Sequence, residues 1–240
     1  MKNIIISGAN GDIGFDITKQ LSNKEYKLTL ISGTNEKTYS KLKEFAENHN
    51  SIKCIVKADI SNPLDVKNAF SGISENQDAA ICCIGKSLER KPISEWDYDY
   101  IQNGLKSNLI APLLFCSNVI PFLNPNAVIV ILGSIAGEIG SGSGSGLYSS
   151  AKAALHNIVK TLSKEMSDKS IRVIGISPGL IETDFHNNDL EKTIETAKKI
   201  TLSKRIGTSN DISKLVEFLI SENSSYINGT VIRIDGGILL

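Results

Sequence analysis

The chain has 240 residues, a length at which α/β proteins commonly fold as one domain with a substantial core. Its 26 basic and 26 acidic residues cancel and are interspersed, so we expect no charged surface that would recruit a nucleic acid or an anionic membrane. The balance favours a small neutral or anionic ligand, and we expect a single domain over residues 1–240.

The spacing of the cysteines predicts no metal site. All four lie in apolar segments and lack the paired Cys and His spacing of a zinc site, so we expect buried, reduced thiols in a cytoplasmic protein. They are Cys54, Cys82, Cys83 and Cys116. Three isoleucines precede the first glycine, a run too short for a signal peptide or a transmembrane helix, and no other stretch approaches a membrane span.

Seven apolar runs bounded by turn residues predict seven β-strands. They lie at or near residues 3–7, 27–31, 52–56, 79–84, 127–132, 171–176 and 230–234. Helix-compatible segments separate most of them, beginning with residues 12–21. Because the runs are apolar throughout, we expect parallel strands covered by helices on both faces and joined by right-handed crossovers. The sequence therefore predicts a doubly wound α/β domain with a seven-stranded parallel sheet.

Glycines cluster between the first predicted strand and the first predicted helix. Gly8, Gly11 and Gly14 permit a tight turn and let the pyrophosphate of a dinucleotide approach main-chain N–H groups at the start of the helix. The structural alternative is that the glycines serve only the turn itself. The residues assigned to cofactor binding here are Ser7, Gly8, Asn10, Gly11, Asp12, Ile13 and Gly14.

The end of the second predicted strand bears on the choice between NAD and NADP. An acid at this position bonds the ribose hydroxyls of NAD, whereas the 2′-phosphate of NADP prefers cationic or small polar partners. Ser32 occupies the position of the acid, and Thr34 and Lys37 lie nearby. We therefore assign Ser32 and Thr34 to the cofactor site and expect NADP(H) rather than NAD(H). The same residues also fit a polar turn without a ligand.

Asp59 and Ile60 follow the third predicted strand. In this kind of fold Asp59 is placed to accept a hydrogen bond from an adenine amino group. Since Asn62 and Pro63 come next, a cap at the N-terminus of a helix explains Asp59 equally well. We assign Asp59 and Ile60 to the cofactor site.

Ser134, Tyr148 and Lys152 carry the strongest chemical signal. Ser134 ends a strand, and Tyr148 and Lys152 are four residues apart on the following helix, so their side chains share one helix face. A tyrosine with a pKa of roughly 10 is a poor base at neutral pH. At about 4 Å and an effective dielectric constant of about 20, Lys152 attracts a phenolate by about 4 kcal/mol, which predicts a Tyr148 pKa near ~7. The glycine- and serine-rich residues 141–146 fit an active-site loop between them.

This arrangement, with a glycine-rich first turn, resembles the short-chain dehydrogenase/reductase family. Further matches to the family pattern are Gly85, Asn108, Pro178, Gly179, Thr183, Arg205, Gly207, Asp211, Ile212, Asn228, Gly229, Asp235, Gly236 and Gly237. The resemblance implies a Rossmann-like NAD(P)-dependent oxidoreductase. It also implies additional cofactor contacts from Gly85, Tyr148, Lys152, Pro178, Gly179, Ile181 and Thr183.

The resemblance further implies catalytic roles. Tyr148 protonates a carbonyl oxygen while a hydride leaves C4 of the nicotinamide, or the reverse for alcohol oxidation. Ser134 hydrogen-bonds the same oxygen, Lys152 binds the nicotinamide ribose and lowers the tyrosine pKa, and Asn108 holds a water that links the lysine to solvent. The structural alternatives are, in the same order, a half-buried aromatic residue, a strand cap, a solvated charge and a polar residue that bends a helix.

Two features depart from the family pattern. The middle glycine of the first turn is Gly11, as in the longer sugar-nucleotide epimerase branch, and Asp12 stands where single-domain members usually have glycine. Residues 82–85 read CCIG in place of an asparagine-rich segment, so Gly85 keeps the opening beside the cofactor but the side-chain hydrogen bonds are lost. The two adjacent cysteines suggest either redox chemistry or inert thiols, and their apolar strand favours the second.

Residues 183–203 resemble the family's substrate lid. Phe185 and His186 are candidates to line a substrate pocket with Ser134 and Tyr148, and exposure on the surface is the alternative for His186.

The predicted reaction is hydride transfer between NAD(P) and a carbonyl or secondary alcohol, and the nearest specific form is a 3-oxoacyl-acyl-carrier-protein reductase. Such reductases often carry basic residues before the fifth strand, for an acidic carrier protein, whereas residues 122–128 are uncharged, so a small-ketone, sugar or secondary-metabolite reductase stays open. The alternatives are a catalytically silent NAD(P)-binding sensor or scaffold, and a sugar-nucleotide epimerase or dehydratase. The resemblance implies a homotetramer or dimer, in which the apolar tail at 236–240 is buried at a subunit contact.

Overall fold

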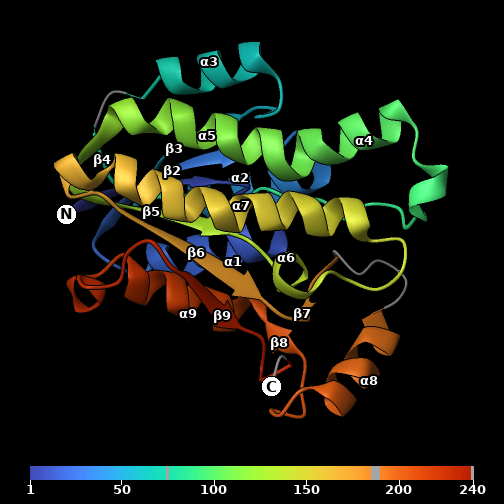
Figure 1. The fold of residues 1–240 in the computed structure, drawn as a ribbon. Coiled ribbons are helices and arrows are strands. Elements are labelled where there is room, and N and C mark those ends of the chain that lie inside the picture. The colour runs from blue at the N-terminus through green and yellow to red at the C-terminus, as the bar shows by residue number, and fades with distance from the viewer. Residues whose placement is uncertain (74–75, 185–189, 239–240) are drawn as a thin grey trace.

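A computed structural model describes residues 1–73, 76–184 and 190–238 of the chain. Figure 1 shows a central sheet with α3, α4, α5 and α7 on one side and α1 and α9 on the other. The helices are α1 (Asp12–Ser22), α2 (Glu36–Glu47), α3 (Pro63–Ser71), α4 (Tyr98–Leu105), α5 (Ala111–Val119), α6 (Ala136–Ile139), α7 (Gly146–Glu165), α8 (Leu190–Ile200) and α9 (Ser209–Leu219).

The sheet has seven parallel strands in the order β3-β2-β1-β4-β5-β6-β9. Their bounds are β1 (Lys2–Ser7), β2 (Tyr26–Ser32), β3 (Ile52–Lys57), β4 (Gln77–Cys82), β5 (Leu123–Leu132), β6 (Arg172–Pro178) and β9 (Val231–Ile234). The predicted doubly wound sheet and its seven strands are confirmed. The strand order reverses between β1 and β4, and in open parallel sheets the crevice at such a switch point holds the ligand.

Buried apolar side chains form one cluster on each face of the sheet. Residues of α3, α5 and α7 pack on one face, and residues of α1, α2 and α9 pack on the other. The inner face of α7 repeats every three or four residues, with Ala151, Leu155, Val159 and Leu162 buried. This packing fixes the rotation of α7 and thereby the direction of the side chains that it presents to the site.

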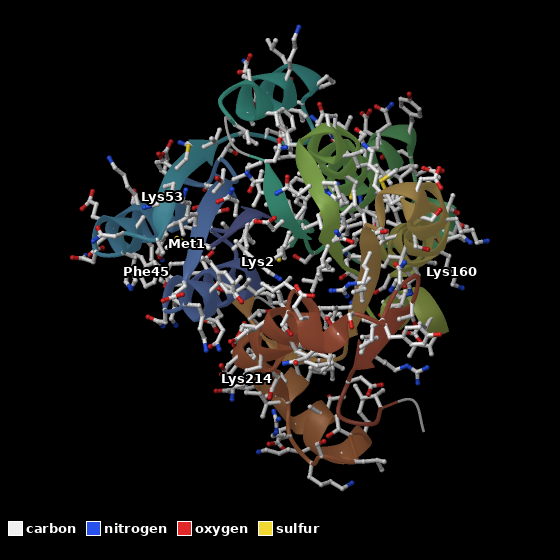
Figure 2. The ribbon with its side chains drawn as sticks, turned by 90° about the vertical axis from the view of Figure 1, so that its left-hand side faces the viewer. Met1, Lys2, Phe45, Lys53, Lys160 and Lys214 are labelled. Carbon is white, nitrogen blue, oxygen red and sulfur yellow. The ribbon has the colours of Figure 1, made fainter. Side chains whose placement is uncertain are left out.

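The edge strand β3 differs from the other strands. Lys53, Cys54 and Lys57 are exposed, and within the described residues β3 pairs with β2 alone, at the edge of the sheet. Figure 2 shows Lys53 at the side of the molecule opposite Lys160 of α7. The expectation of four buried thiols is therefore wrong for Cys54, and the other cysteines are buried or partly buried.

A second, two-stranded parallel sheet pairs β7 (Ile181–Glu182) with β8 (Gly207–Thr208). It lies beyond the carboxyl end of β6 and joins the two ends of the segment that contains α8. Strands of two residues have no detectable periodicity, so the sequence did not indicate them.

The expectation that no internal stretch approaches a membrane span is wrong by length and composition. The helix Tyr98–Phe122, which comprises α4, η2 (Lys106–Ile110), α5 and η3 (Ile120–Phe122), has 25 residues and a mean hydropathy of 1.3 in its most apolar window. Its inner side chains, among them Phe115 and Val119, are fully buried against the sheet, and core helices of this kind satisfy the same criterion.

Candidate active site

A cleft of about 1380 Å³ opens at the carboxyl ends of β1, β4, β5 and β6. It therefore lies at the switch point of the sheet, where ligands bind in open α/β folds. The predicted site residues that line it are Gly11, Asp12, Ile13, Gly14, Gly85, Ser134, Tyr148, Lys152, Pro178, Gly179, Ile181 and Thr183. The predicted site residues that do not line it are Ser7, Gly8, Asn10, Ser32, Thr34, Asp59, Ile60 and Asn108. Phe185 and His186 lie outside the described residues.

The glycines of the first turn serve different purposes. Gly8 has φ +76°, and a Cβ on Gly14 would lie 2.1 Å from the Gly8 carbonyl oxygen, so the turn itself requires both. For Gly8 and Gly14, the geometry of the turn is therefore sufficient to explain the glycine. A Cβ on Gly11 would meet nothing closer than 3.5 Å, and Gly11 lines the cleft at the N-terminus of α1. That N-terminus carries no side-chain cap from Gly11, so its first N–H groups suit a phosphate.

Asn10 joins this turn to the loop after β2. Its Oδ1 accepts a hydrogen bond from Gly33 N at 2.8 Å, and its Nδ2 donates to Thr38 Oγ1 at 2.7 Å. Ser32 is fully buried, and its hydroxyl donates to the Gly33 carbonyl at 2.9 Å. The polar turn is therefore present. The assignment of Asn10 and Ser32 to the cofactor site stays a prediction, in which Asn10 acts by shaping the loop.

The loop after β3 contains Asp59. Asn62, not Asp59, caps α3, because the Asn62 side chain accepts a hydrogen bond from Leu64 N at 2.9 Å. The helix-cap alternative for Asp59 is therefore wrong. Asp59 Oδ1 accepts a hydrogen bond from Ser61 N at 2.9 Å. Burial acts to raise the Asp59 pKa, but the hydrogen bonds from Ser61 and the nearby lysines lower it overall, so Asp59 is an ionised acceptor at neutral pH.

Ser134 and Tyr148 face one another across the cleft wall. Ser134 follows β5, and its Oγ accepts a hydrogen bond from Ala136 N at 3.2 Å. Burial raises the pKa of Tyr148 to about 12, although a hydrogen bond with Ser134 acts to lower it. Tyr148 therefore holds its proton at neutral pH and can donate it.

Lys152 lies beside the tyrosine ring and is almost completely buried. Its Nζ is 5.7 Å from the centroid of the Tyr148 ring and donates a hydrogen bond to the Leu132 carbonyl at 3.1 Å. Burial lowers the Lys152 pKa to about 8. The expectation that Lys152 brings the Tyr148 pKa near 7 is wrong for the protein's own surroundings. Burial disfavours the charged form of both groups, and it is the largest cause of each pKa shift.

Asn108 interrupts a helix and also reaches the site. It is fully buried in η2, a π-helical turn, where its Nδ2 donates to the Gly104 carbonyl at 3.3 Å and its Oδ1 accepts from Lys86 N at 3.0 Å. A Cβ on Gly85 would lie 3.1 Å from Lys152 Nζ and 3.3 Å from Asn108 Oδ1. Lys152 and Asn108 therefore flank the same point above Gly85. Asn108 lies in the irregular turn of the helix and also next to Lys152, so both interpretations of this residue fit its position.

Two adjacent thiols lie near Lys152, and Cys83 also lines the cleft. Cys82 is buried, and burial raises its pKa to about 11, while burial also raises the pKa of Cys83. Thiols that remain protonated at neutral pH are poor nucleophiles. Inert packing of Cys82 and Cys83 is therefore the interpretation that the structure favours over redox chemistry. Within the described residues, no group of three or more His, Cys, Asp or Glu side chains could hold a metal ion.

Thr183 lines the cleft directly after β7. Its Oγ1 donates a hydrogen bond to the Ile181 carbonyl at 3.3 Å. The next main-chain N–H, that of Asp184, donates to Asp12 Oδ2 at 2.7 Å. The part of the predicted lid that the structure describes includes α8, which contributes Lys192, Thr193, Thr196 and Ile200 to the cleft.

Both the sequence and the fold match known proteins. A family model described as Enoyl-(Acyl carrier protein) reductase matches residues 8–239. A short-chain dehydrogenase/reductase from Brucella melitensis, described as SDR:Glucose/ribitol dehydrogenase, has the same fold with a TM-score of 0.90 and 25% identity, covering 100% of this chain and 97% of that one. The chain belongs to the short-chain dehydrogenase/reductase family. It is an NAD(P)-dependent oxidoreductase that acts on CH–OH groups.

Two relatives within the short-chain dehydrogenase/reductase family are similar over nearly their whole length. The "Uncharacterized oxidoreductase YmfI" of Bacillus subtilis (strain 168) is 32% identical over 241 residues, covering 98% of both chains. The "3-oxoacyl-[acyl-carrier-protein] reductase FabG" of Buchnera aphidicola subsp. Baizongia pistaciae is 31% identical over 241 residues, covering 98% of this chain and 96% of that protein. No inserted domain separates this chain from either relative.

The residues present fit a dinucleotide. The short-chain dehydrogenase/reductase cofactor needs a phosphate cradle and a ribose donor, and the open N-terminus of α1 at Gly11 and the buried ammonium of Lys152 line one continuous cleft. Gly85 keeps the space between them free, because any side chain there would press on Lys152 and Asn108.

His156 is a site neighbour that the sequence analysis missed. Its Nε2 accepts a hydrogen bond from Ser134 N at 3.4 Å, and a Cβ on Gly133 would lie 2.2 Å from the same nitrogen. Burial lowers the pKa of His156, against a nearby Glu138 that raises it, so the ring is neutral at neutral pH. The spacing of four from Lys152 was the available signal, since it repeats the interval between Tyr148 and Lys152 on one helix face.

Proposed function

We propose that this chain is an NADP(H)-dependent reductase of the keto group of a 3-oxoacyl thioester, with Tyr148 as the proton donor. The observation that carries the proposal is the pairing of Tyr148, which burial holds protonated, with Ser134 on the wall of the cleft and Lys152 beside it. When a carbonyl oxygen replaces the hydrogen bond between them, the protonated phenol and the hydroxyl can both donate to that oxygen. That arrangement suits reduction, in which the developing oxyanion needs a proton.

When bound, NADPH would supply a hydride from C4 to the carbonyl carbon. Tyr148 donates its proton to the carbonyl oxygen, and Ser134 orients that oxygen, so the products are a secondary alcohol and the oxidised dinucleotide. Lys152 would hold the nicotinamide ribose hydroxyls of the bound dinucleotide, and it passes a proton toward Tyr148. Asn108 supports a water-borne proton path from solvent to Lys152, since both flank the space above Gly85. Alcohol oxidation follows the same steps in reverse.

The loop after β2 supports NADP(H). Ser32, Gly33 and Thr34 place no carboxylate where NAD(H) would require one, and Asn35 caps α2 through Thr38 N. Lys37 is exposed one turn away, where an ammonium can approach a 2′-phosphate. A structure of the same fold from Burkholderia cenocepacia, 22% identical with a TM-score of 0.89, is described in complex with NADP, so the fold accommodates this dinucleotide.

Several relatives support a thioester substrate carried by acyl carrier protein. The Buchnera aphidicola relative and one from Rickettsia typhi, 32% identical, are both named 3-oxoacyl-[acyl-carrier-protein] reductases. The cleft offers an apolar wall for an acyl chain through Leu88, Ile139 and Ile200. The family model's description favours a second candidate, reduction of the carbon–carbon double bond of an enoyl thioester.

The assembly and the location of the protein are part of the same proposal. The outer side of the helix Tyr98–Phe122 is mixed, with Gln102 and Lys106 exposed beside Tyr98 at 71% and Ile110 at 43%, and these two apolar side chains support a contact in a dimer or tetramer. Ile238 lines the cleft near the C-terminus, so part of the apolar tail serves the site. The FabG relatives and the buried free thiols support a cytoplasmic location.

The test is a nucleotide titration followed by turnover. NADPH and NADH are titrated separately, with fluorescence of the bound nicotinamide as the signal. NADPH consumption and substrate conversion are then followed with a 3-oxoacyl thioester, the matching enoyl thioester, small ketones and a sugar nucleotide. Tighter NADPH binding and consumption with the 3-oxoacyl thioester are expected. Turnover of the enoyl thioester alone would support the second candidate. Nucleotide binding without turnover would support a sensor or scaffold. Conversion of a sugar nucleotide without net NADPH consumption would support an epimerase or dehydratase. Failure to bind either nucleotide would overturn the proposal.

A further inference from the structure

A carboxylate stands at the phosphate-binding end of the cleft. Asp12 is the first residue of α1, and it lines the cleft beside Gly11 and Ile13. Its Oδ2 accepts a hydrogen bond from the main-chain N–H of Asp184 at 2.7 Å. This bond joins two segments that lie 172 residues apart, the first turn of α1 and the segment after β7.

The bond completes a two-point attachment of Thr183. On one side of Thr183, Ile181 and Glu182 pair with Gly207 and Thr208 in the small sheet. On the other side, Asp184 is held by Asp12. Thr183 itself lines the cleft, and its hydroxyl is bonded to the Ile181 carbonyl. A residue between two such attachments has little freedom to change the direction of its side chain.

Asp12 is poorly placed to strengthen the binding of a dinucleotide. An acid in the first turn is favourable for the helix, because it interacts with the positive end of the helix dipole. A pyrophosphate bound to the same turn would instead be repelled by that carboxylate. Among the described residues that line the cleft, the other carboxylate is Glu89, which pairs with Lys91 at 3.5 Å. Asp12 therefore places a negative charge beside the residues expected to bind phosphate. The stabilising interaction that the structure shows for its carboxylate is the hydrogen bond from Asp184 N.

We propose that Asp12 is a positioning residue, which fixes Asp184 and through it orients Thr183 toward the cleft, while weakening the affinity for the pyrophosphate. The inference rests on the proposed function, since it assumes that a nicotinamide dinucleotide occupies the cleft. It predicts that the negative charge at position 12 weakens dinucleotide binding, whereas hydrogen-bond acceptance at position 12 supports turnover.

Two substitutions separate these effects. Asp12→Asn removes the charge and keeps an acceptor oxygen, whereas Asp12→Ala removes both. The matched control is Asp16→Asn, one turn later on α1, which removes an equal charge from a residue that pairs with Lys19 at 2.9 Å and does not line the large cleft.

The first readout needs no cofactor. Amide hydrogen exchange is measured at Asp184 in the purified protein, and Asp12→Ala is expected to accelerate it about 10-fold or more, because that N–H loses its hydrogen bond to the Asp12 carboxylate. Asp12→Asn should change the exchange rate by about 3-fold or less, and Asp16→Asn should leave it unchanged. Equal exchange in wild type and Asp12→Ala would overturn the inference.

The second readout separates KM from kcat. Both Asp12 variants should bind NADPH about 3- to 10-fold more tightly than wild type, because the like charge is gone. Only Asp12→Ala should lose about 10-fold in kcat, with kcat retained in Asp12→Asn. Equal kcat in the two variants would overturn the positioning role even if exchange at Asp184 increases. If wild type itself neither binds NADPH nor turns over, the proposed function fails, and the exchange result still decides whether the Asp12–Asp184 bond exists in solution.

Discussion

The two halves of the cleft are built in different ways. In the catalytic half, at the ends of β4 and β5, the chemistry lies in buried side chains that contact one another, and Lys152 and Asn108 are almost or fully buried. In the phosphate half, at the end of β1, the glycine turn lines the cleft, and Gly14 has no room for a side chain. Burial sets the protonation states of the first half, while open space and N–H groups define the second. Substitutions should therefore act on charge in one half and on backbone geometry in the other.

The largest effect is expected from Gly14→Ala in the phosphate half. The added Cβ would lie 2.1 Å from the Gly8 carbonyl oxygen and 2.8 Å from its carbon, so the main chain must shift. We expect a loss of at least about 3 kcal/mol in the free energy of unfolding and loss of measurable NADPH binding. Urea denaturation and the nucleotide titration measure the two effects.

Gly11→Ala is the matched control for that substitution. Its φ of −80° suits alanine, and its Cβ would meet nothing closer than 3.5 Å, so stability should change by less than about 1 kcal/mol. Equal destabilisation by the two substitutions would contradict the distinction between a glycine that the fold requires and one that the cleft requires.

In the catalytic half, the pH dependence of stability should reveal the buried Lys152. Its pKa of about 8 in the folded protein lies below its ordinary value of 10.5. Between these pH values the unfolded chain binds a proton that the folded protein has released, so the stability of wild type rises with pH. Relative to Lys152→Met, the gain should be about 3 kcal/mol, since about 2.5 pKa units correspond to 1.36 kcal/mol each.

This gain is measured by urea denaturation at pH 7.5 and pH 10.5. Lys160→Met on the exposed side of the same helix is the control and should show no such change relative to wild type (Figure 2). Parallel curves for wild type and Lys152→Met would mean that Lys152 is not desolvated.

A smaller loss of stability is expected from substitution of Asn10, whose side chain joins the first turn to the loop after β2. Asn10→Ala removes the hydrogen bonds to Gly33 N and Thr38 Oγ1, and we expect a loss of about 1 to 2 kcal/mol together with weaker NADPH binding. Asn48→Ala, at the exposed end of α2, is the control, and its effect should stay within about 0.5 kcal/mol. Unchanged NADPH affinity in Asn10→Ala would show that the loop after β2 keeps its shape without Asn10.

The sequence predicted the features that depend on local periodicity and spacing. The seven strands follow from uninterrupted apolar runs, and Tyr148 and Lys152 follow from an interval of four on one helix. The two-residue strands β7 and β8 are too short to leave a pattern. The bond between Asp12 and Asp184 joins positions 172 residues apart, which no local signal indicates.

Burial is the property that the sequence indicates least well. A spacing of four brings Tyr148 and Lys152 together, but it does not show how much solvent each loses, and that loss decides the direction of both pKa shifts. Cys54 was expected to be buried because its strand is apolar, but the strand lies at the edge of the sheet.

The most direct test of the account is a single-turnover experiment with Tyr148→Phe. The variant is mixed with NADPH and with the 3-oxoacyl thioester, or with whichever carbonyl of the panel wild type reduces, and NADPH oxidation is followed. Tyr226→Phe is the control, because Tyr226 is fully exposed and remote from the cleft lining. If Tyr148 donates the proton, Tyr148→Phe should lose about 100- to 10,000-fold in rate while binding NADPH within about 3-fold of wild type, and Tyr226→Phe should match wild type. A Tyr148→Phe variant that oxidises NADPH at the wild-type rate would contradict the assignment of Tyr148 as the proton donor.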